Sequence, residues 1–494
     1  MTASDAVSDH FDRVAARAGD RVAICEGDRP LSFRRLLEWS HAITRVLAPL
    51  VGEPGVRVAL LLPNSATFVA TFYGALRVGA VVAPLNPRYR SQELEYYLRD
   101  LDPVALVIDS ASIPLALEVL SQLSRPPALL EASASGGISA VRQASAEHRA
   151  ISQPDSAPLL QQYTSGSTGR PKAVVRTHAA LLRELEALQW VFQTSESDRF
   201  LGAAPFSHVN GLVRTMMASM HVGATLYPVE EFHRRYVLDL ITREGMTVFG
   251  GVPQMFNLLG QTPRRGPVDL SSLRVLFSSS APLLPHDNRR FFARYGMFVR
   301  QLYGSTETGT ISVASDSNPP QSLTTVGTPL PGVRVEVVDP NGARVDRGEE
   351  GEISISSPFS ATSYLDNSTA TEKSFQGGFY RSGDLGTMDS QGHISISGRR
   401  SLVINRGGFK VHPYEVEEAI ARHPSVREVA VYGAPSPHGD DIVCCCIVAS
   451  AECSAEDILL HCQGRIAGYK IPSRIEFRAS LPKTQTGKIL RASL

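Results

Sequence analysis

Short apolar runs alternate with longer segments of helical character from about residue 30 to residue 450. The clearest runs are VRVALLL at 56–62, AVVAPL at 80–85, ALVID at 105–109 and VLFSSS at 275–280. Short runs rich in β-branched residues are typical of strands, and strands that alternate with helices form layered α/β folds. The pattern therefore predicts an α/β architecture.

The pattern changes at two places along the chain. Ser, Ala, Pro and Gln become frequent between about 130 and 157, which predicts a surface connection. After residue 324 strand-like runs are separated by turn signals, and the pair Asn341-Gly342 favours a hairpin turn. We therefore expect a mostly β subregion over about 324–398.

The last part of the chain has a mixed pattern. Residues 413–494 contain the helical segment PYEVEEAIARH, strand-like runs EVAVYG and DIVCCCIVA, a further helix and a basic tail. This predicts a large domain at 1–399, a hinge at 400–402 and a small α+β domain at 403–494. The length agrees, because 494 residues exceed the roughly 250–300 over which one hydrophobic core grows.

Composition and charge exclude several classes of function. Lys plus Arg and Asp plus Glu each number 49, so no nucleic-acid partner is expected. No stretch reaches the roughly 18 apolar residues of a membrane span, so we expect a soluble protein. The six cysteines lack zinc-finger or disulfide-scaffold spacing, which favours the reducing cytoplasm. Of these, Cys444 to Cys446 stand in an apolar run and are expected in the core.

The segment YTSGSTGRPK at 163–172 has the composition of a phosphate-binding loop. Gly166 and Gly169 allow backbone N–H groups to approach a polyanion, hydroxyl groups add donors, and Lys172 adds a positive charge. A flexible surface turn is the alternative. The Walker pattern G-x-x-x-x-G-K-[ST] occurs nowhere in the chain, which excludes a P-loop of that type.

The segment QLYGSTETG at 301–309 is expected to follow a strand and to turn at Gly304. It presents an aromatic ring on Tyr303, a hydroxyl on Thr306 and a carboxylate on Glu307. Because Mg²⁺ takes one or two carboxylates together with phosphate oxygens, Glu307 is a suitable metal ligand beside a triphosphate. A solvated turn is the alternative.

Two further segments carry single charged groups between glycines. In YRSGDLG at 380–386 a predicted turn holds Asp384, whose carboxylate can accept hydrogen bonds from ribose hydroxyls. In PKTQTGKIL at 482–490 a predicted loop holds Lys488, which can enter a cleft. Each segment alone is equally compatible with a structural turn.

In order and spacing these four segments resemble the core motifs of the adenylate-forming superfamily, which comprises acyl-CoA and aryl-CoA synthetases, peptide-synthetase adenylation domains and firefly luciferase. Residues 61–94 also resemble the N-terminal part of the synthetases. The chain is most similar to the branch with 4-coumarate:CoA ligases and fatty or dicarboxylic acyl-CoA synthetases. The resemblance implies a large adenylate-binding domain with a small, mobile C-terminal domain.

The resemblance also implies the site residues and the cofactors ATP, Mg²⁺ and coenzyme A. The positions that match catalytic residues are Lys488, Thr306, Glu307 and His208. The positions that match nucleotide-binding or coenzyme-binding residues are Thr164, Ser165, Gly166, Ser167, Thr168, Gly169, Lys172, Ser280, Ala281, Tyr303, Asp384, Arg399, Gly408, Phe409 and Lys410.

The implied roles are mostly electrostatic. Tyr303 stacks on adenine, and Asp384 and Arg399 bind ribose. Glu307 holds Mg²⁺, while Lys488 bridges the carboxylate of the acid and the α-phosphate. In-line phosphoryl chemistry depends on positioning and charge neutralisation more than on covalent help, so such groups suffice for adenylation.

In the superfamily the small domain rotates after adenylation and presents a segment that matches RGGFKVHP at 406–413 to the thiol. The hinge of this chain departs from the common pattern G-R-x-[KD]-[DE], because Ser401 and Leu402 stand at the two charged positions. Ala173 also replaces a glycine after the first motif. These departures concern the balance between the two orientations.

The segment PFSHVNGLVRTMM at 205–217 matches the wall of the acyl pocket. His208 matches a histidine that gates this pocket, with a surface imidazole as the alternative. Arg214 stands where the branch more often has a small or uncharged residue, and we expect it either to pair with a second carboxylate of the substrate or to extend to the surface. Because residues 201–213 contain no acidic side chain, an amino acid substrate is disfavoured.

The leading hypothesis is therefore an AMP-forming acyl-CoA ligase that acts on a small-molecule carboxylic acid. One alternative is a ligase that loads the phosphopantetheine of an acyl carrier protein. Another is a half-reaction enzyme that only converts a supplied acyl-adenylate to a thioester. Retention of Lys488, Glu307 and Lys172 argues against that last alternative, and luciferase-like oxygenation is disfavoured because it is rare in the superfamily.

Overall fold

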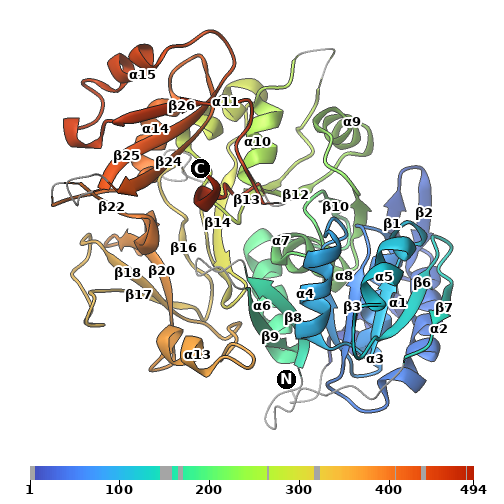
Figure 1. The fold of residues 1–494 in the computed structure, drawn as a ribbon. Helices are drawn as coiled ribbons and strands as arrows, with labels where there is room; N and C mark the ends of the chain where they lie inside the picture. Colours follow the sequence, from blue (N-terminus) through green and yellow to red (C-terminus); the bar gives the residue numbers. More distant parts are fainter. Residues whose placement is uncertain are drawn as a thin grey trace.

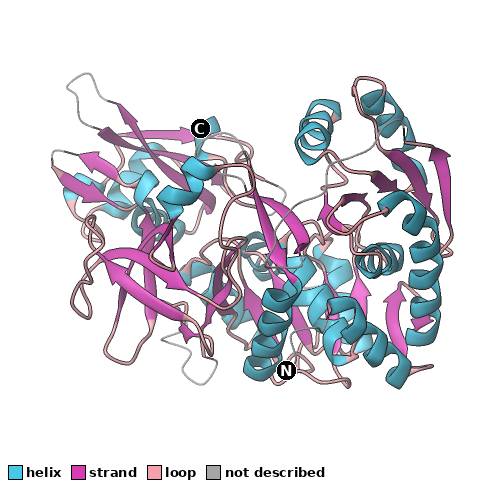
Figure 2. Cartoon of the chain, turned by 90° about the horizontal axis from the view of Figure 1, so that it is seen from below, coloured by secondary structure: helices cyan, strands magenta, loops and turns pink. Residues whose placement is uncertain are grey.

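The computed structural model describes residues 6–144, 158–164, 171–263, 266, 268–315, 323–406, 408–435, 441–484 and 487–494. Figure 1 shows a large domain built from two mixed sheets and a β-rich part, with a small domain beside helices α10 and α11 of the large one. Seen from below in Figure 2, the strands of the large domain lie between helices. The expected α/β fold with a small C-terminal α+β domain is confirmed.

The first sheet has seven strands in the order β7-β6-β5-β3-β4-β8-β9. Its strands are β3 Arg57–Leu61, β4 Val81–Pro84, β5 Ala105–Ile108, β6 Ala128–Ala132, β7 Ile138–Arg142, β8 Pro158–Thr164 and β9 Lys172–Thr177. The parallel centre is fully buried, which explains the continuous apolar runs of β3, β4 and β5. The predicted surface connection is wrong at its start, because the hairpin β6–β7 occupies it.

The second sheet has nine strands in the order β16-β15-β14-β13-β12-β10-β11-β1-β2. Its strands are β1 Val22–Glu26, β2 Arg29–Ser32, β10 Arg199–Gly202, β11 Thr225–Pro228, β12 Val248–Gly251, β13 Val275–Ser278, β14 Arg300–Ser305, β15 Gly309–Val313 and β16 Thr328–Pro329. The strands from β11 to β14 are parallel, and β15 then turns back along β14.

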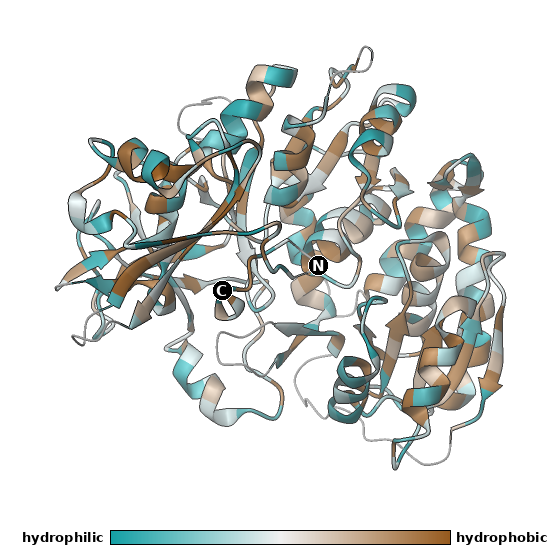
Figure 3. Cartoon of the chain, turned by 45° about the horizontal axis from the view of Figure 1, so that its top comes forward, coloured by the Kyte–Doolittle hydropathy of each residue, from teal (hydrophilic) through white to brown (hydrophobic). Residues whose placement is uncertain are grey.

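Helices cover these sheets and fill the space between them. They are α1 Val7–Ala18, α2 Phe33–Val51, α3 Ala66–Arg77, α4 Ser91–Leu101, α5 Ile113–Leu120, α6 His178–Phe192, α7 Val209–Gly211, the π-helical segment η2 Leu212–Met217, α8 Ala218–Val222, α9 Arg234–Glu244, α10 Pro253–Gly260 and α11 Pro285–Tyr295. In Figure 3 the strands are mostly brown, and the helices alternate between brown and teal faces. Helix α3 is buried almost all round, and Gly74 allows it to pack against the backbone of Ser40 in α2.

The β-rich part confirms the predicted change of pattern. It contains β17 Arg334–Val338, β18 Gly351–Ser356, helix α13 Ser368–Ser374, β19 Phe375–Gln376, β20 Phe379–Met388 and β21 Ile394–Arg399. The turn at Asn341-Gly342 is present, with Asp339 N donating to the Ala343 carbonyl over 2.8 Å and Gly342 at φ +89°. The 3₁₀ turn η3 at Arg400–Leu402 follows β21 and coincides with the predicted hinge.

The small domain contains β22 Ile404–Arg406, β23 Phe409–Val411, α14 Pro413–Ala421, β24 Val426–Pro435, β25 Asp441–Ala449, α15 Ala455–Cys462, η4 Gly468–Lys470, β26 Arg474–Phe477 and η5 Arg491–Ser493. Cys444, Cys445 and Cys446 lie on β25 and are at most 1% exposed, so their place in the core is confirmed.

Within the described part of the chain, no helix is both long and apolar enough to cross a membrane.

Candidate active site

The segment QLYGSTETG forms the hairpin of β14 and β15 at the edge of the parallel strands. The strand continues through Gly304, which pairs with Thr310, so the predicted turn at Gly304 is wrong and the chain reverses at 306–308. A Cβ on Gly304 would lie 2.4 Å from both Arg214 Nη2 and the Gly309 carbonyl. Glycine is therefore required here by close packing and not by a turn.

Asp384 lies between two partners from different strands. Its Oδ2 accepts a hydrogen bond from the Tyr303 hydroxyl at 2.7 Å, and its Oδ1 lies 2.8 Å from Arg399 Nε. Burial and the Asp384 charge raise the pKa of Tyr303 well above its usual value, and Asp384 raises the pKa of Arg399. The three predicted nucleotide-binding residues therefore meet at one point, with the carboxylate held by a neutral phenol and a permanent cation.

The predicted turn around Asp384 is wrong, because this residue lies within β20. It pairs with Arg399 across the β20–β21 ladder. Gly383, at φ +73°, and a register shift after Leu385 produce the local irregularity that the two glycines suggested. The ladder therefore fixes Asp384 more rigidly than a loop would.

Glu307 lies beside Lys172, with Tyr364 between them. The Tyr364 hydroxyl donates to Glu307 Oε1 at 2.9 Å, and Lys172 Nζ lies 4.7 Å from the centre of the same ring. Glu307 is 7% exposed. Burial of Tyr364 and the negative charge of Glu307 both raise the pKa of Tyr364. Tyr364 lies outside the four motifs, so it was not predicted from the sequence.

The phosphate-loop motif is described only at its two ends. Thr164 ends β8 and Lys172 begins β9, and the two residues pair across an antiparallel ladder. The other predicted phosphate ligands, Ser165, Gly166, Ser167, Thr168 and Gly169, lie outside the described residues. Ser280 and Ala281 follow β13, and Ser280 adopts φ +75°, an unfavourable conformation for a residue with a Cβ.

Lys488 comes from the small domain and faces the large one. Burial lowers the pKa of Lys488, Arg399 lowers it further, and the nearby carboxylates of Asp384 and Glu307 raise it. The adjacent Gly487 packs so closely on Gln254 of α10 that a Cβ there would lie 2.5 Å from Gln254 Oε1. Lys488 therefore lies at the interface between the domains, where the charges of Asp384, Arg399 and Glu307 act on it.

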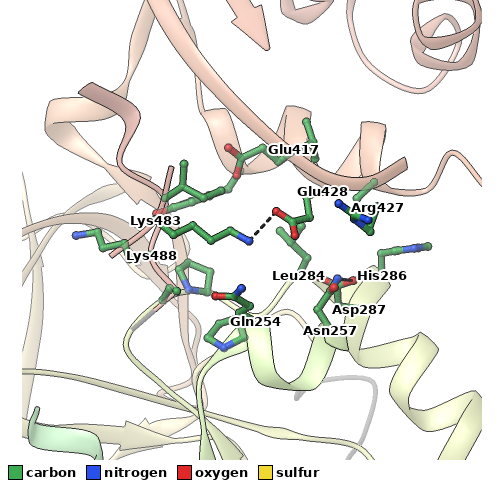
Figure 4. A pocket seen from close by; sticks show the side chains of 18 of the residues that line it. Gln254, Asn257, Leu284, His286, Asp287, Glu417, Arg427, Glu428, Lys483 and Lys488 are labelled. Carbon is green, nitrogen blue, oxygen red and sulfur yellow. Dashed lines mark hydrogen bonds and ion pairs between the residues drawn. The ribbon is translucent and has the colours of Figure 1, made fainter. Parts of the chain in front are cut away.

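The two domains enclose a pocket beside this lysine. Its walls include Gln254, Asn257, Leu284, Asp287, Glu417, Glu428, Lys483 and Lys488. Figure 4 shows the side chains of α10 and α11 facing those of the small domain, with Lys483 Nζ 2.6 Å from Glu428 Oε2. Glu418 of α14 joins the two domains directly, because it accepts from His286 N at 3.2 Å and lies 3.6 Å from Arg289 Nη1.

Gly408, Phe409 and Lys410 are not among the residues that line this pocket. They lie on or beside β23, where Phe409 is 56% exposed and stacks on Tyr469 with 4.5 Å between ring centres. The predicted thiol-side residues and the predicted adenylation lysine therefore occupy different places on the small domain.

The hinge has a charged contact that the sequence did not indicate. Ser401 and Leu402 are uncharged, as read from the sequence, but the preceding Arg400 reaches back to the large domain. Arg400 Nη1 lies 3.0 Å from Glu352 Oε2, the same atom that accepts from Arg381 Nε at 3.0 Å. The contact joins the hinge to β18 while the small domain faces the large one.

Arg214 is turned inward, so the surface alternative for it is wrong, and His208 is partly buried with its Nε2 covered. His208 caps α7, and burial lowers its pKa to about 4, so the imidazole is neutral at pH 7. Arg214 is 4% exposed within η2 and donates from Nε to Thr310 Oγ1 at 3.0 Å and from Nη1 to Ser279 Oγ at 3.2 Å. Neither partner was indicated by the sequence.

Comparisons with known proteins agree with this geometry. Residues 11–365 match the family described as AMP-binding enzyme, and residues 415–488 match the AMP-binding enzyme C-terminal domain. The chain is 30% identical to a long-chain-fatty-acid–CoA ligase of Mycobacterium tuberculosis, covering 94% of this chain and 93% of that protein. It is also 30% identical to an oxalate–CoA ligase of Arabidopsis thaliana, covering 99% of this chain and 98% of that protein. ATP-bound MatB from Rhodopseudomonas palustris superimposes with a TM-score of 0.87 at 27% identity over 98% of each chain.

Proposed function

The chain belongs to the family of AMP-binding enzymes, and its relatives are ATP-dependent, AMP-forming acid–thiol ligases. From this premise we propose its reaction. A small carboxylic acid attacks the α-phosphate of ATP to give an acyl-adenylate and pyrophosphate. The thiol of coenzyme A then attacks the acyl carbon, which releases AMP and leaves the thioester.

The position of Lys488 opposite the paired Asp384 and Arg399 is the observation that carries this proposal. Asp384 Oδ1 lies 2.8 Å from Arg399 Nε in the large domain, while Lys488 of the small domain lines the pocket between the domains, where the charges of both residues and of Glu307 act on it. Asp384 and Arg399 form the ribose-binding pair, and Lys488 enters from the opposite domain to the position where a carboxylate and an α-phosphate would meet. Bringing positive charge to that point offsets the negative charge of both reactants.

Glu307 is a suitable ligand for Mg²⁺. It is a buried carboxylate that keeps free lone pairs after accepting from Tyr364, and Mg²⁺ binds one or two carboxylates with phosphate oxygens. When bound, the ion would neutralise charge on the phosphates. Lys172 adds a second cation on the same side, and Thr306 adds a hydroxyl at the tip of the hairpin.

The choice of coenzyme A over a carrier protein is supported by the relatives, since the two named above are described as CoA ligases. The exposed segment Gly408–Lys410 is the candidate thiol-side element, which the small domain would carry to the site by rotating about 400–402. The neutral imidazole of His208 is able to accept a proton or to change position as a gate at pH 7.

A panel of carboxylic acids assayed in two ways tests the proposal. Each acid is tested for ATP–pyrophosphate exchange and for AMP-forming thioester production with coenzyme A. We expect both activities with the same acid. Exchange without a CoA product would favour a carrier protein, and product only from a supplied acyl-adenylate would favour the half-reaction enzyme.

A further inference from the structure

We propose that Arg214 binds a second carboxylate of the acid, so that the substrate is a dicarboxylic acid of which only one carboxylate is adenylated. The inference rests on the proposed ligase activity and names the substrate class of the same site. It makes Arg214 a specificity-determining residue.

The backbone around Arg214 is unusual. The residue lies in the six-residue π-helical segment η2, between the short helix α7 and helix α8. Such segments are rare and are frequently found at functional sites. Every residue of this segment is buried, and the Arg214 guanidinium lies against Thr310, Ser279 and Gly304.

Two hydroxyl groups hold the guanidinium in place. Thr310 and Ser279 accept from it, and Thr310 donates from its hydroxyl and its backbone N–H to Glu184 Oε1 at 2.7 and 2.8 Å. Glu184 Oε2 in turn pairs with Arg176 Nη2 at 2.6 Å, and both residues are at most 1% exposed. The network fixes the position of Arg214 while leaving Nη2 without a hydrogen-bond partner among the described residues.

The network also has an excess of positive charge. Burial raises the pKa of Glu184, but Arg176 and Arg214 outweigh it and keep this carboxylate ionised. Burial lowers the pKa of Arg214 only to about 10, so it stays protonated at pH 7. Two guanidinium groups therefore face one carboxylate, and a buried charge without a counterion is costly unless a ligand supplies one.

Other buried polar atoms, on the segment that leads into η2 and beside Ser279, lack partners within the described structure. They are Ser207 Oγ, His208 Nε2, Asn210 Oδ1 and Ser278 Oγ. Asn210 Nδ2 donates to the Gly251 carbonyl at 2.9 Å, Gly251 pairs with Ser278, and the next residue, Ser279, accepts from Arg214. Because buried polar atoms are nearly always hydrogen-bonded, this concentration indicates a place for a polar group of a ligand.

The two ends of the substrate are assigned to neighbouring positions along β14. Tyr303 bonds to Asp384, whose charge acts on Lys488, and the next residue, Gly304, packs against Arg214 Nη2, with a bulge in the β14–β15 ladder between the two residues. We assign the reacting carboxylate to Lys488 and the distant one to Arg214, whose planar group suits a carboxylate.

The test uses pairs of acids with equal carbon number, namely malonate with propionate, succinate with butyrate and glutarate with valerate. Wild type, Arg214→Met and the control Arg183→Met, an exposed arginine of α6, are assayed by pyrophosphate exchange. We expect wild type to prefer the dicarboxylate of at least one pair. In Arg214→Met the kcat/KM for that acid should fall roughly 10²-fold, mainly through KM, with the monocarboxylate unchanged.

Several outcomes would overturn the inference. An equal loss on both acids of a pair would assign Arg214 a general role, and a wild type that exchanges only monocarboxylates would exclude the second carboxylate while upholding the ligase. Absence of exchange with every acid would instead count against the proposed function. If Arg214→Met unfolds in thermal denaturation, Arg214→Lys, which keeps the charge, should retain part of the preference, and loss of the preference in that folded variant would contradict us.

Discussion

The small domain carries two elements that differ in their surroundings. Lys488 is partly buried against the large domain, and burial lowers its pKa. The hairpin β22–β23 faces away, with Phe409 56% exposed and stacked on Tyr469 within its own domain. On the proposed function this orientation suits adenylation, and the small domain would have to turn before the exposed hairpin reached the site. Under that proposal, the groups for the two chemical steps lie on different faces of one domain.

Removal of Lys488, which faces the large domain, should have the largest effect. In Lys488→Ala the rate of pyrophosphate exchange should fall roughly 10²- to 10³-fold, because a preorganised charge at the developing transition state is lost. Thioester formation from a supplied acyl-adenylate should stay within a few fold of wild type. The control Lys373→Ala removes an exposed lysine and should change neither rate, and an unchanged exchange rate in Lys488→Ala would reject the role.

Truncation of Phe409, on the exposed hairpin β22–β23, should give the opposite pattern of losses in the two half-reactions. In Phe409→Ala the thioester step should fall roughly 10- to 10²-fold, because positioning of the thiol is disturbed, while exchange is unchanged. The matched control Tyr469→Phe keeps the ring that supports Phe409. Equal losses in both steps would show that the hairpin acts through folding and not through the second step.

The pH dependence of docking should give the smallest effect. Burial raises the pKa of Asp287 from 3.8 to about 6, with Glu418 and Glu428 of the small domain adding to the rise and Arg290 and Asn257 opposing it. Between pH 3.8 and about 6, Asp287 keeps its proton when the small domain is docked on the large one, but loses it when the residue is solvated. Docking of the small domain is therefore favoured at low pH and weakens as the pH rises through about 6.

Asp287→Asn removes this titration and serves as the test. The ratio of exchange to thioester formation in wild type should fall by a few fold between pH 5 and 7, and the variant should lose that slope. The neighbouring His286 titrates with the opposite sign, because burial lowers its pKa to about 4 and its docked form resists protonation. His286→Asn should therefore steepen the slope, and an identical profile for wild type and Asp287→Asn would contradict the role of this carboxyl.

Much of the fold followed from local pattern. The apolar runs at 57–61, 81–84 and 105–108 are buried parallel strands, and the Asn-Gly turn lies where expected. The errors came where glycine was taken for a turn. Gly304 and the glycines beside Asp384 lie in strands, because glycine also allows close packing and ladder irregularity, which a sequence does not distinguish from a turn.

The motif residues of the candidate site were predicted from composition, spacing and the family resemblance, because their chemistry is local to each segment. The groups that position them were not. Glu307 with Tyr364 and Arg400 with Glu352 join residues 57 and 48 positions apart, and Arg214 with Thr310 joins residues 96 positions apart. The sequence pattern of an arginine on an apolar helix is the same whether its guanidinium extends to water or is buried. Only the folded chain, which places Arg214 beside Ser279 and Thr310, fixes that choice, because burial and hydrogen-bond partners depend on residues distant in sequence.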